Sequence, residues 1–218
     1  MQNNELTIRL ERKSDYREVE HITREAFWNN YVPGCDEHYL AHLLRTADCF
    51  LPELDFIAEL GGRLAGNIMY TRAVIRGDDQ TDHPVLTFGP LSVLPDLQKE
   101  GVGGALVRHS LSAARDLGHT AVLIYGDPAY YCRFGFVPAE QYRIGTKYHT
   151  YADALQAIEL VPGALSGKSG LFNEDSVFEI DDVAAERFDG HFPPKERLTG
   201  LRSQQKFQQQ LSMQKPRV

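Results

Sequence analysis

The sequence has 218 residues, of which 42% are apolar and 24% are charged, and its net charge is -7. This acidic balance argues against a nucleic-acid partner, and no apolar stretch approaches the roughly 20 residues that span a bilayer, which argues against a membrane partner. Three cysteines without C-x-x-C spacing, and an N-terminus without a secretory apolar region, predict a cytoplasmic protein with reduced thiols.

The first half of the chain predicts a strand, two helices and three further strands. Residues 6–10 alternate like a short strand, and helical apolar spacing follows to about Trp28 and again after Asp36. Beyond Pro52 the spacing becomes that of strands, and two consecutive glycines predict a hairpin turn between the first two of them. The third strand is expected in PVLTFGPLSVL.

The second half predicts a helix, a strand and a short helix, and is less regular thereafter. ALVRHSLSAARDLG predicts a helix with Gly118 at its C-cap, TAVLIYG a buried strand, and AYYCRFGF a short helix after Asp127-Pro128. ALQAIELV and SVFEI are candidates for two further strands around PGALSGKSG. The polar, glutamine-rich end predicts a solvated helix or a disordered arm.

A glycine turn, QKEGVGG, joins the third of these strands to the next helix and is typical of an anion site. Backbone amides at the positive end of the helix dipole would face outward, and Lys99 adds a positive charge. Gly101 and Gly103 permit positive φ and close approach of a ligand. Glu100 opposes an anion, so we expect it to face solvent. The alternative is a tight turn that uses glycine only for closure.

The spacing of the glycines excludes two phosphate-binding motifs. A dinucleotide fingerprint would need glycine where Leu106 stands, and a Walker loop ending in the GKS of residues 167–169 would need one at Pro162. The pattern that remains is Q-x-x-G-x-G, which residues 98–103 fill.

This pattern resembles the acetyl-CoA-binding motif of the GNAT N-acetyltransferase superfamily, and YYCRFGF resembles its F-Y-x-x-x-G-F segment. The element order is also similar, and the chain looks most similar to YhbS-like acetyltransferases. The resemblance implies an α+β fold with α/β/α layers, a mixed, mostly antiparallel sheet with a splayed fourth and fifth strand pair, and flanking helices. We therefore expect a GNAT-like domain at residues 1–165 and a C-terminal extension of the same unit at 166–218.

The same resemblance implies acetyl-CoA as co-substrate and no metal. The pantetheine arm would pair with the backbone of a bulged strand, and the pyrophosphate would lie on the amides of the glycine turn. Gly89-Pro90 suits a bulge, because proline cannot donate to a ladder and glycine weakens one. The implied cofactor-binding residues are Leu91, Ser92, Val93, Gln98, Lys99, Glu100, Gly101, Val102, Gly103 and Gly104.

The implied reaction is direct transfer of the acetyl group to a primary amine in a ternary complex. An ammonium with a pKa near ~10.4 must lose a proton before it attacks, and the leaving thiolate must gain one. The resemblance assigns the second task to Tyr131, with Tyr130 as a competitor. Glu59, Ser92 and a water chain are alternatives for the base. Asp127 stands where the superfamily commonly has asparagine, and we expect it to cap the next helix.

Two further patterns carry weaker functional interpretations. His38 and His42 are spaced for one helix face and could hold a metal, but without a third ligand we favour a solvated face. Cys132 beside Tyr131 suggests an acetyl-cysteine, but a small residue packed in a helix is the preferred interpretation.

The function has one alternative, a catalytically idle acyl-CoA-binding or interaction module that binds without turnover. The acceptor is a small-molecule or peptide amine of unknown identity. Its specificity is expected from residues 28–40, 76–84 and 140–175, and a homodimer is left open.

Overall fold

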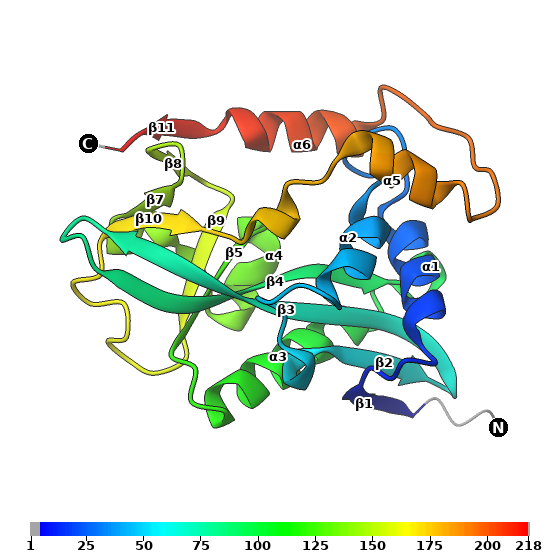
Figure 1. Ribbon diagram of the computed structural model, residues 1–218, viewed down its shortest axis with the longest axis horizontal. Coiled ribbons are helices and arrows are strands. Elements are labelled where there is room, and N and C mark those ends of the chain that lie inside the picture. Colours follow the sequence, from blue (N-terminus) through cyan, green and yellow to red (C-terminus); the bar gives the residue numbers. More distant parts are fainter. Residues whose placement is uncertain (1–4, 218) are drawn as a thin grey trace. The chain divides into compact units, whose positions relative to one another are not determined.

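The computed structural model describes residues 5–217, which form two compact units (Figure 1). Residues 1–4 of the predicted 1–165 domain and Val218 of the predicted 166–218 extension lie outside the described residues. One unit contains residues up to Tyr70, Gly89–Ser110 and Ser176–Gln205; the other contains Thr71–Phe88, Leu111–Asp175 and the chain from Lys206. The predicted C-terminal extension therefore contributes residues to both units.

The first unit begins with the strands that the sequence predicts. β1 (Leu6–Leu10) pairs antiparallel with β2 (Phe56–Leu60), and β2 pairs antiparallel with the start of β3 (Arg63–Gly77). The two-glycine hairpin turn between β2 and β3 is confirmed. The β2–β3 register shifts between Ala58 and Glu59, so this hairpin contains one irregularity.

Three helices complete the first unit: α1 (Tyr16–Phe27), α2 (Glu37–Leu44) and α5 (Asp182–Asp189). Figure 1 shows α5 beside α1 and α2. The first two confirm the helical spacing of the sequence, whereas α5 was not predicted. Buried side chains of α2 pack against Met69 of β3, and Val177 and Phe178 pack against the same cluster.

A buried ion cluster ties α5 to α1 and α2. Arg24 is 1% exposed and donates to the carboxylate of Asp189 from Nε at 2.5 Å and from Nη2 at 3.1 Å. His38 is fully buried with its Nε2 3.1 Å from the same carboxylate, so the solvated-face interpretation is wrong for this residue. His42 is exposed and its Nδ1 contacts Glu20 at 3.0 Å. Helical spacing alone does not reveal that α5 covers one of the two histidines.

The second unit is built on mostly antiparallel strands. Besides residues 71–77 of β3, the strands wholly or partly in this unit are β4 (Asp82–Val93), β5 (Ala121–Tyr125), β6 (Val137–Pro138), β7 (Ile144–Thr146), β8 (Thr150–Ala152), β9 (Leu155–Glu159), β10 (Gly170–Asn173) and β11 (Gln214–Pro216). β4 and β5 are parallel and meet through one residue pair, Leu86 and Val122. β9 pairs antiparallel with β5 and β6, and β10 pairs antiparallel with β3. The mixed, mostly antiparallel sheet is confirmed.

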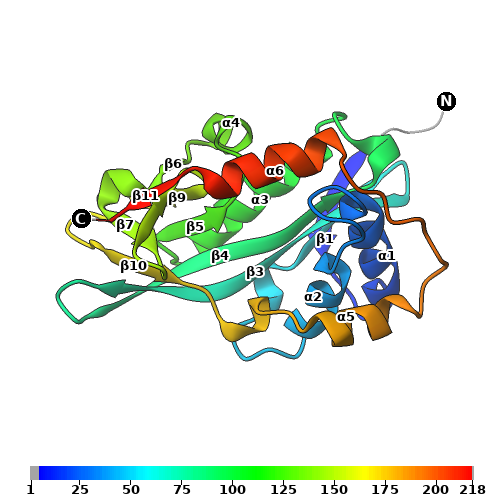
Figure 2. The same ribbon diagram turned by 90° about the horizontal axis from the view of Figure 1, so that it is seen from above.

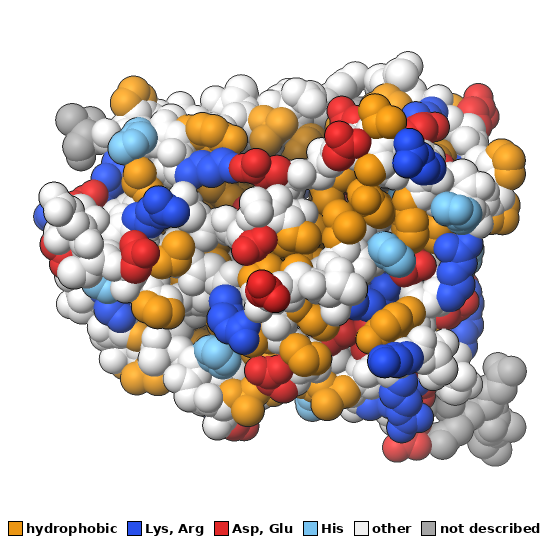
Figure 3. Space-filling model, in the orientation of Figure 1, with side chains coloured by type: hydrophobic (Ala, Val, Ile, Leu, Met, Phe, Trp, Pro, Cys, Tyr) orange, Lys and Arg blue, Asp and Glu red, His pale blue; other side chains and the backbone are white. Residues whose placement is uncertain are grey.

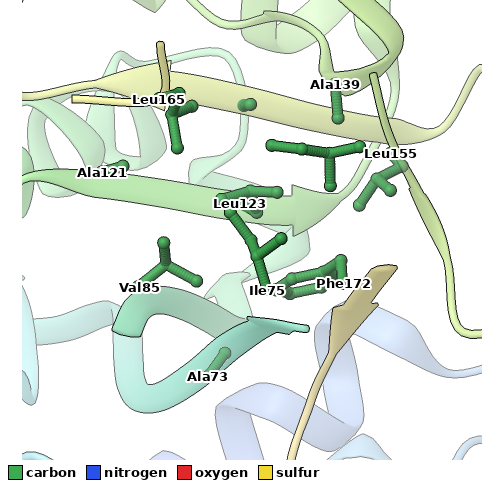
Figure 4. Close-up of a cluster of buried hydrophobic side chains, with 11 residues drawn as sticks. Ala73, Ile75, Val85, Ala121, Leu123, Ala139, Leu155, Leu165 and Phe172 are labelled. Atoms are coloured by element: carbon green, nitrogen blue, oxygen red, sulfur yellow. The ribbon is translucent and has the colours of Figure 1, made fainter. Parts of the chain in front are cut away.

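The core of the second unit lies on one face of these strands (Figure 4). Ile75 of β3, Val85 of β4, Leu123 of β5 and Phe172 of β10 point toward one another there, and Leu165 closes one side. Each of these side chains is at most 6% exposed. The odd-numbered residues of β5 therefore face this core, and the even-numbered ones face away from it.

Two helices flank the strands where the sequence places them. α3 (Val102–Asp116) is followed closely by Gly118, whose φ of 89° confirms the predicted capping glycine at the C-terminal end of the helix. α4 (Pro128–Tyr131) is a single turn followed by a 3-10 turn at Cys132–Phe134. Further 3-10 turns cover Pro52–Leu54, Pro95–Leu97, Ala139–Tyr142 and Ser176–Phe178.

One predicted strand, SVFEI, is wrong. Its residues form the 3-10 turn at Ser176–Phe178, and the strand of this region is β10, which lies in GLFN. A Cβ at Gly170 would lie 2.2 Å from the carbonyl oxygen of Arg76, so the strand begins at a residue that must lack a side chain. That glycine looks like a loop residue in the sequence, which hid the strand.

The C-terminal tail forms a helix and a strand. α6 (Arg202–Ser212) confirms the helix alternative, and β11 (Gln214–Pro216) continues from it toward the C-terminus (Figure 2). β11 pairs antiparallel with β8, and Arg217 donates to the carboxylate of Asp78. Within residues 5–217, no helix is long and apolar enough to cross a membrane.

Candidate functional site

The glycine turn lies in the first unit, between β4 and α3. Lys99 and Gly101 adopt positive φ, at 68° and 87°. The first hydrogen bond of α3 runs from the amide of Ala105 to the carbonyl of Gly101 at 2.9 Å. The amides of residues 102–104 therefore precede the first helical hydrogen bond, as an anion site at a helix N-terminus requires.

Gly103 differs from the expectation. It lies in the first turn of α3 and does not have positive φ; the second left-handed residue of the turn is Lys99. The helix begins one residue after Gly101, which explains why only the first of the two glycines of the motif is left-handed. The contribution of Gly103 is therefore the absence of a side chain.

The surroundings of the turn leave its backbone accessible and add a second basic side chain. No atom lies within 4 Å of the position that a Cβ at Gly101 would occupy. At Gly104 the equivalent position is 3.4 Å from both terminal nitrogens of Arg108, so this guanidinium lies over the first turn of α3. Lys99 and Glu100 are both exposed. Arg108 was not predicted from the sequence, although its i,i+4 spacing from Gly104 could have indicated it.

The strand end before the turn is held by several contacts. Gln98 donates from its side chain to the carbonyl of Val93 at 3.2 Å, so the first residue of the motif fastens the turn to β4. The Ser92 hydroxyl is buried and donates to Thr23 of α1 at 3.1 Å. A Cβ at Gly66 would lie 2.4 Å from the Ser92 carbonyl, so β3 and β4 approach closely here. The Gly89-Pro90 peptide bond is cis.

The two side chains considered as general bases have structural partners. Ser92 is 1% exposed and is hydrogen-bonded beneath α1. Glu59 pairs with Arg9 at 2.7 Å. Neither geometry favours proton abstraction from an amine.

Tyr131 lies in the second unit, at the end of α4. Its ring contacts those of Phe88 and Phe136, at centroid distances of 5.9 and 5.5 Å. A Cβ at Gly126 would lie 2.2 Å from Cε2 of Tyr131, so β5 must be followed by a glycine for this ring to fit. Tyr131 is partly buried. The ring is thus positioned by the end of β5 and by Phe88 of β4.

The neighbouring residues distinguish Tyr131 from its competitor. The Tyr130 ring faces the guanidinium of Arg133 at 4.3 Å, and Arg133 donates to the Tyr130 carbonyl. Asp127 accepts from the amide of Ala129 at 3.0 Å, which confirms it as the cap of α4, and its other oxygen pairs with Lys206 at 2.5 Å. The Asp127 pKa is lowered, chiefly by the bond from Lys206.

Cys132 and the histidines form no second site. Cys132 is exposed at the end of α4, so its interpretation as a packed residue is wrong. The described part of the chain contains no group of three or more His, Cys, Asp or Glu side chains that could hold a metal.

A sizeable cavity lies in each unit. In the first, about 460 Å³ is bordered by two ion pairs, Arg63 with Asp96 at 2.7 Å and Lys195 with Glu25 at 2.8 Å. In the second, about 410 Å³ lies within the predicted specificity region 140–175. The acid at its rim, Glu159, accepts from two backbone amides and so supports the loop.

Comparison with known proteins shows the family of the chain. The acetyltransferase (GNAT) family model matches residues 16–136, which is more than half of the chain. The chain belongs to the GNAT family. Its GNAT match includes the glycine turn and α4, and it ends before the C-terminal part.

Two GNAT relatives from Escherichia coli (strain K12) resemble the chain in sequence. It is 32% identical over 133 residues to the uncharacterized N-acetyltransferase YjhQ, covering 61% of this chain and 70% of that protein. It is 28% identical over 166 residues to the uncharacterized N-acetyltransferase YhbS, covering 76% of this chain and 94% of the relative. These alignments confirm the resemblance that the two sequence motifs indicate.

Two crystal structures of GNAT proteins resemble the fold. One is YhbS from Escherichia coli in complex with CoA, with a TM-score of 0.71 and 26% identity, covering 80% of this chain and 92% of that one. The other is a GNAT acetyltransferase from Brucella melitensis in complex with acetyl-CoA, with a TM-score of 0.63 and 28% identity over 80% and 99% of the two chains. The fold class expected from the sequence is therefore confirmed.

Proposed function

We propose that this GNAT protein transfers the acetyl group of acetyl-CoA to a primary amine of a small molecule or peptide in the cytoplasm. The observation that carries the proposal is the glycine turn, where amides of residues 102–104 precede the first helical bond and the space above Gly101 is open. The CoA and acetyl-CoA complexes of two relatives support it. Neither nucleic acid nor a membrane is proposed as a partner.

The chain's own groups would hold acetyl-CoA in two ways. The amides of the turn, together with Lys99 and Arg108, suit the pyrophosphate, because helix N-termini and basic side chains bind phosphate. The backbone of residues 91–93 would pair with the pantetheine arm as an added strand. An amide of this segment, that of Val93, would polarise the thioester carbonyl.

Tyr131 would supply the proton for the leaving group. When the amine nitrogen attacks the thioester carbon, a C–N bond forms and the C–S bond breaks, leaving a thiolate that must be protonated or hydrogen-bonded. A phenol held among Phe88 and Phe136 is a suitable donor, because an apolar setting excludes competing water.

Tyr131→Phe is expected to lower kcat about 10- to 100-fold, because the variant keeps the ring contacts and loses only the donor. The dissociation constant for acetyl-CoA should stay unchanged. Release of free thiol measures turnover, and calorimetry measures binding. Tyr130→Phe is the matched control, because that ring faces Arg133, and it should leave kcat unchanged. An unchanged kcat in Tyr131→Phe would remove the assignment.

The proposed function as a whole is tested by titration with acetyl-CoA followed by thiol release with a panel of primary amines. Binding with turnover supports it. Binding without turnover of any amine favours the idle acyl-CoA-binding module instead, and an absence of binding contradicts both.

A further inference from the structure

A carboxyl group outside the family match lies against β4. Glu174 is the first residue after β10, is partly buried, and accepts from the hydroxyl of Thr87 at 3.5 Å. Burial raises its pKa to about 7, and the Thr87 bond and the charge of Lys147 offset this only in part. A carboxyl whose pKa is raised toward neutral pH is better matched to accepting a proton at that pH than an exposed glutamate is.

The position of Thr87 places this carboxyl at the opening between β4 and β5. The two strands pair only at Leu86 and Val122, so Thr87 is the first β4 residue beyond the pairing. Adjacent side chains of a strand point to opposite faces, and the next residue, Phe88, contacts the ring of Tyr131. Glu174 therefore contacts Thr87 on one face of β4, and Tyr131 contacts Phe88 on the opposite face. All of these residues belong to the second unit.

Tyrosine side chains lie near the carboxyl, because Tyr125 interacts electrostatically with both Glu174 and Tyr148. Tyr125, the last residue of β5, is 45% exposed and contacts Phe172 at a centroid distance of 5.9 Å. Its pKa is raised, first by partial desolvation and then by electrostatic interaction with Glu174 and Tyr148, so it stays neutral at physiological pH. Tyr148 is 73% exposed, with the ammonium of Lys147 5.3 Å from its ring centroid. Exposed rings beside a carboxylate suit an ammonium ligand.

The titratable groups that interact with Glu174 come from different elements. The charge of Lys147, which follows β7, lowers the pKa of Glu174, and Glu174 raises the pKa of Tyr125, which ends β5. Figure 3 shows acidic and basic side chains interspersed on the face it draws, with no large patch of one sign.

We propose that Glu174 is the general base, on the face of β4 opposite Tyr131, for an amine whose carbon chain packs on Tyr125 and Tyr148. This inference rests on the proposed function. Glu174 takes one proton from the ammonium, and the neutral nitrogen forms the C–N bond as the C–S bond breaks. The sulfur takes the hydroxyl proton of Tyr131. The second N–H proton returns to the tyrosinate through solvent, and Glu174 releases its proton, so one proton is released per turnover.

Glu174→Gln tests the base, with Asp175→Asn as the matched control for loss of one adjacent carboxylate. With acetyl-CoA and 2-phenylethylamine, the wild-type rate of thiol release should rise with pH through a group titrating near pH 7. Glu174→Gln should be at least 10-fold slower at pH 8 and should lack this rise, whereas Asp175→Asn keeps both. An unchanged profile in Glu174→Gln overturns the assignment and leaves the proposed function intact.

Two measurements do not depend on the acceptor. In protein labelled with ¹³C at glutamate carboxyls, the resonance lost in Glu174→Gln should titrate near pH 7; a value below about 5 overturns the inference. A folded-state pKa above the unfolded one means that stability is lost as pH rises from about 4.5 through 7. Glu174→Gln should therefore raise Tm at pH 8 and not at pH 5. A lower Tm at pH 8 would indicate a structural acceptor and overturn the proposal.

A wild-type protein that does not bind acetyl-CoA would contradict the proposed function itself. This outcome is separate from the test of Glu174. Calorimetry of the three proteins with acetyl-CoA measures it directly. Equal affinities are expected, because the groups proposed to hold acetyl-CoA, which are the amides of the glycine turn and of residues 91–93 with Lys99 and Arg108, include neither Glu174 nor Asp175.

Discussion

Gly101→Glu is expected to raise the dissociation constant for acetyl-CoA about 1000-fold, or roughly 4 kcal/mol. The side chain would enter the open space above the turn and place a carboxylate where the pyrophosphate is expected. Each charge-assisted hydrogen bond lost contributes about 1.5–3 kcal/mol, so loss of two or three accounts for the effect. The φ of 87° adds strain for any residue with a Cβ. Calorimetric titration measures the change.

Gly62→Glu is the matched control for this variant. Gly62 has φ of 80°, has no atom within 4 Å of its Cβ position, and is exposed in the β2–β3 turn. The two variants therefore share the added charge and the backbone strain. We expect Gly62→Glu to bind acetyl-CoA as the wild type does. Equal affinities in Gly101→Glu and wild type would mean that the glycine turn serves only chain closure.

Most of the fold is predictable because its signals are local. The apolar spacing of α1 and α2, the glycine pair between β2 and β3, and Gly118 after α3 each act within a few residues. The glycine turn is predictable for the same reason. Gly101 carries the positive φ itself, and the N-terminal amides of a helix need no distant partner.

The remainder depends on contacts between distant segments. β10 begins at a glycine that packs on the Arg76 carbonyl, and His38 is buried because α5 covers it. Glu174 lies 87 residues from Thr87, so no spacing rule connects them. The sequence offers Glu174 only as one acid among 30 acidic residues. Burial raises the pKa of Glu174 and so distinguishes it from the other acids, and burial is determined by the tertiary structure.

Asp189→Asn is expected to lower the free energy of unfolding by about 3–5 kcal/mol, because it leaves a buried guanidinium without a counter-charge. Arg24 is 1% exposed, and its donors face this carboxylate at 2.5 and 3.1 Å. Burial lowers the pKa of the neighbouring His38 to about 4, so that ring is neutral at pH 7 and supplies no further charge. Urea denaturation followed by tryptophan fluorescence measures the loss. Trp28 is the single tryptophan, and its ring lies 4.2 Å from the Arg24 guanidinium.

Asp116→Asn provides the control, because Asp116 pairs with Arg115 at 3.8 Å and both side chains are more than half exposed. We expect that substitution to change stability by less than about 1 kcal/mol. A similarly small loss in Asp189→Asn would mean that water reaches Arg24 once the pair is broken.

The C-terminal extension supplies Asp189, so a large loss of stability in Asp189→Asn would place part of the folded domain beyond residue 165. A chain that ends at residue 165 lacks α5, so it loses both the Asp189 carboxylate that pairs with Arg24 and the helix that covers His38. The GNAT core of this protein should then depend on its C-terminal extension to fold.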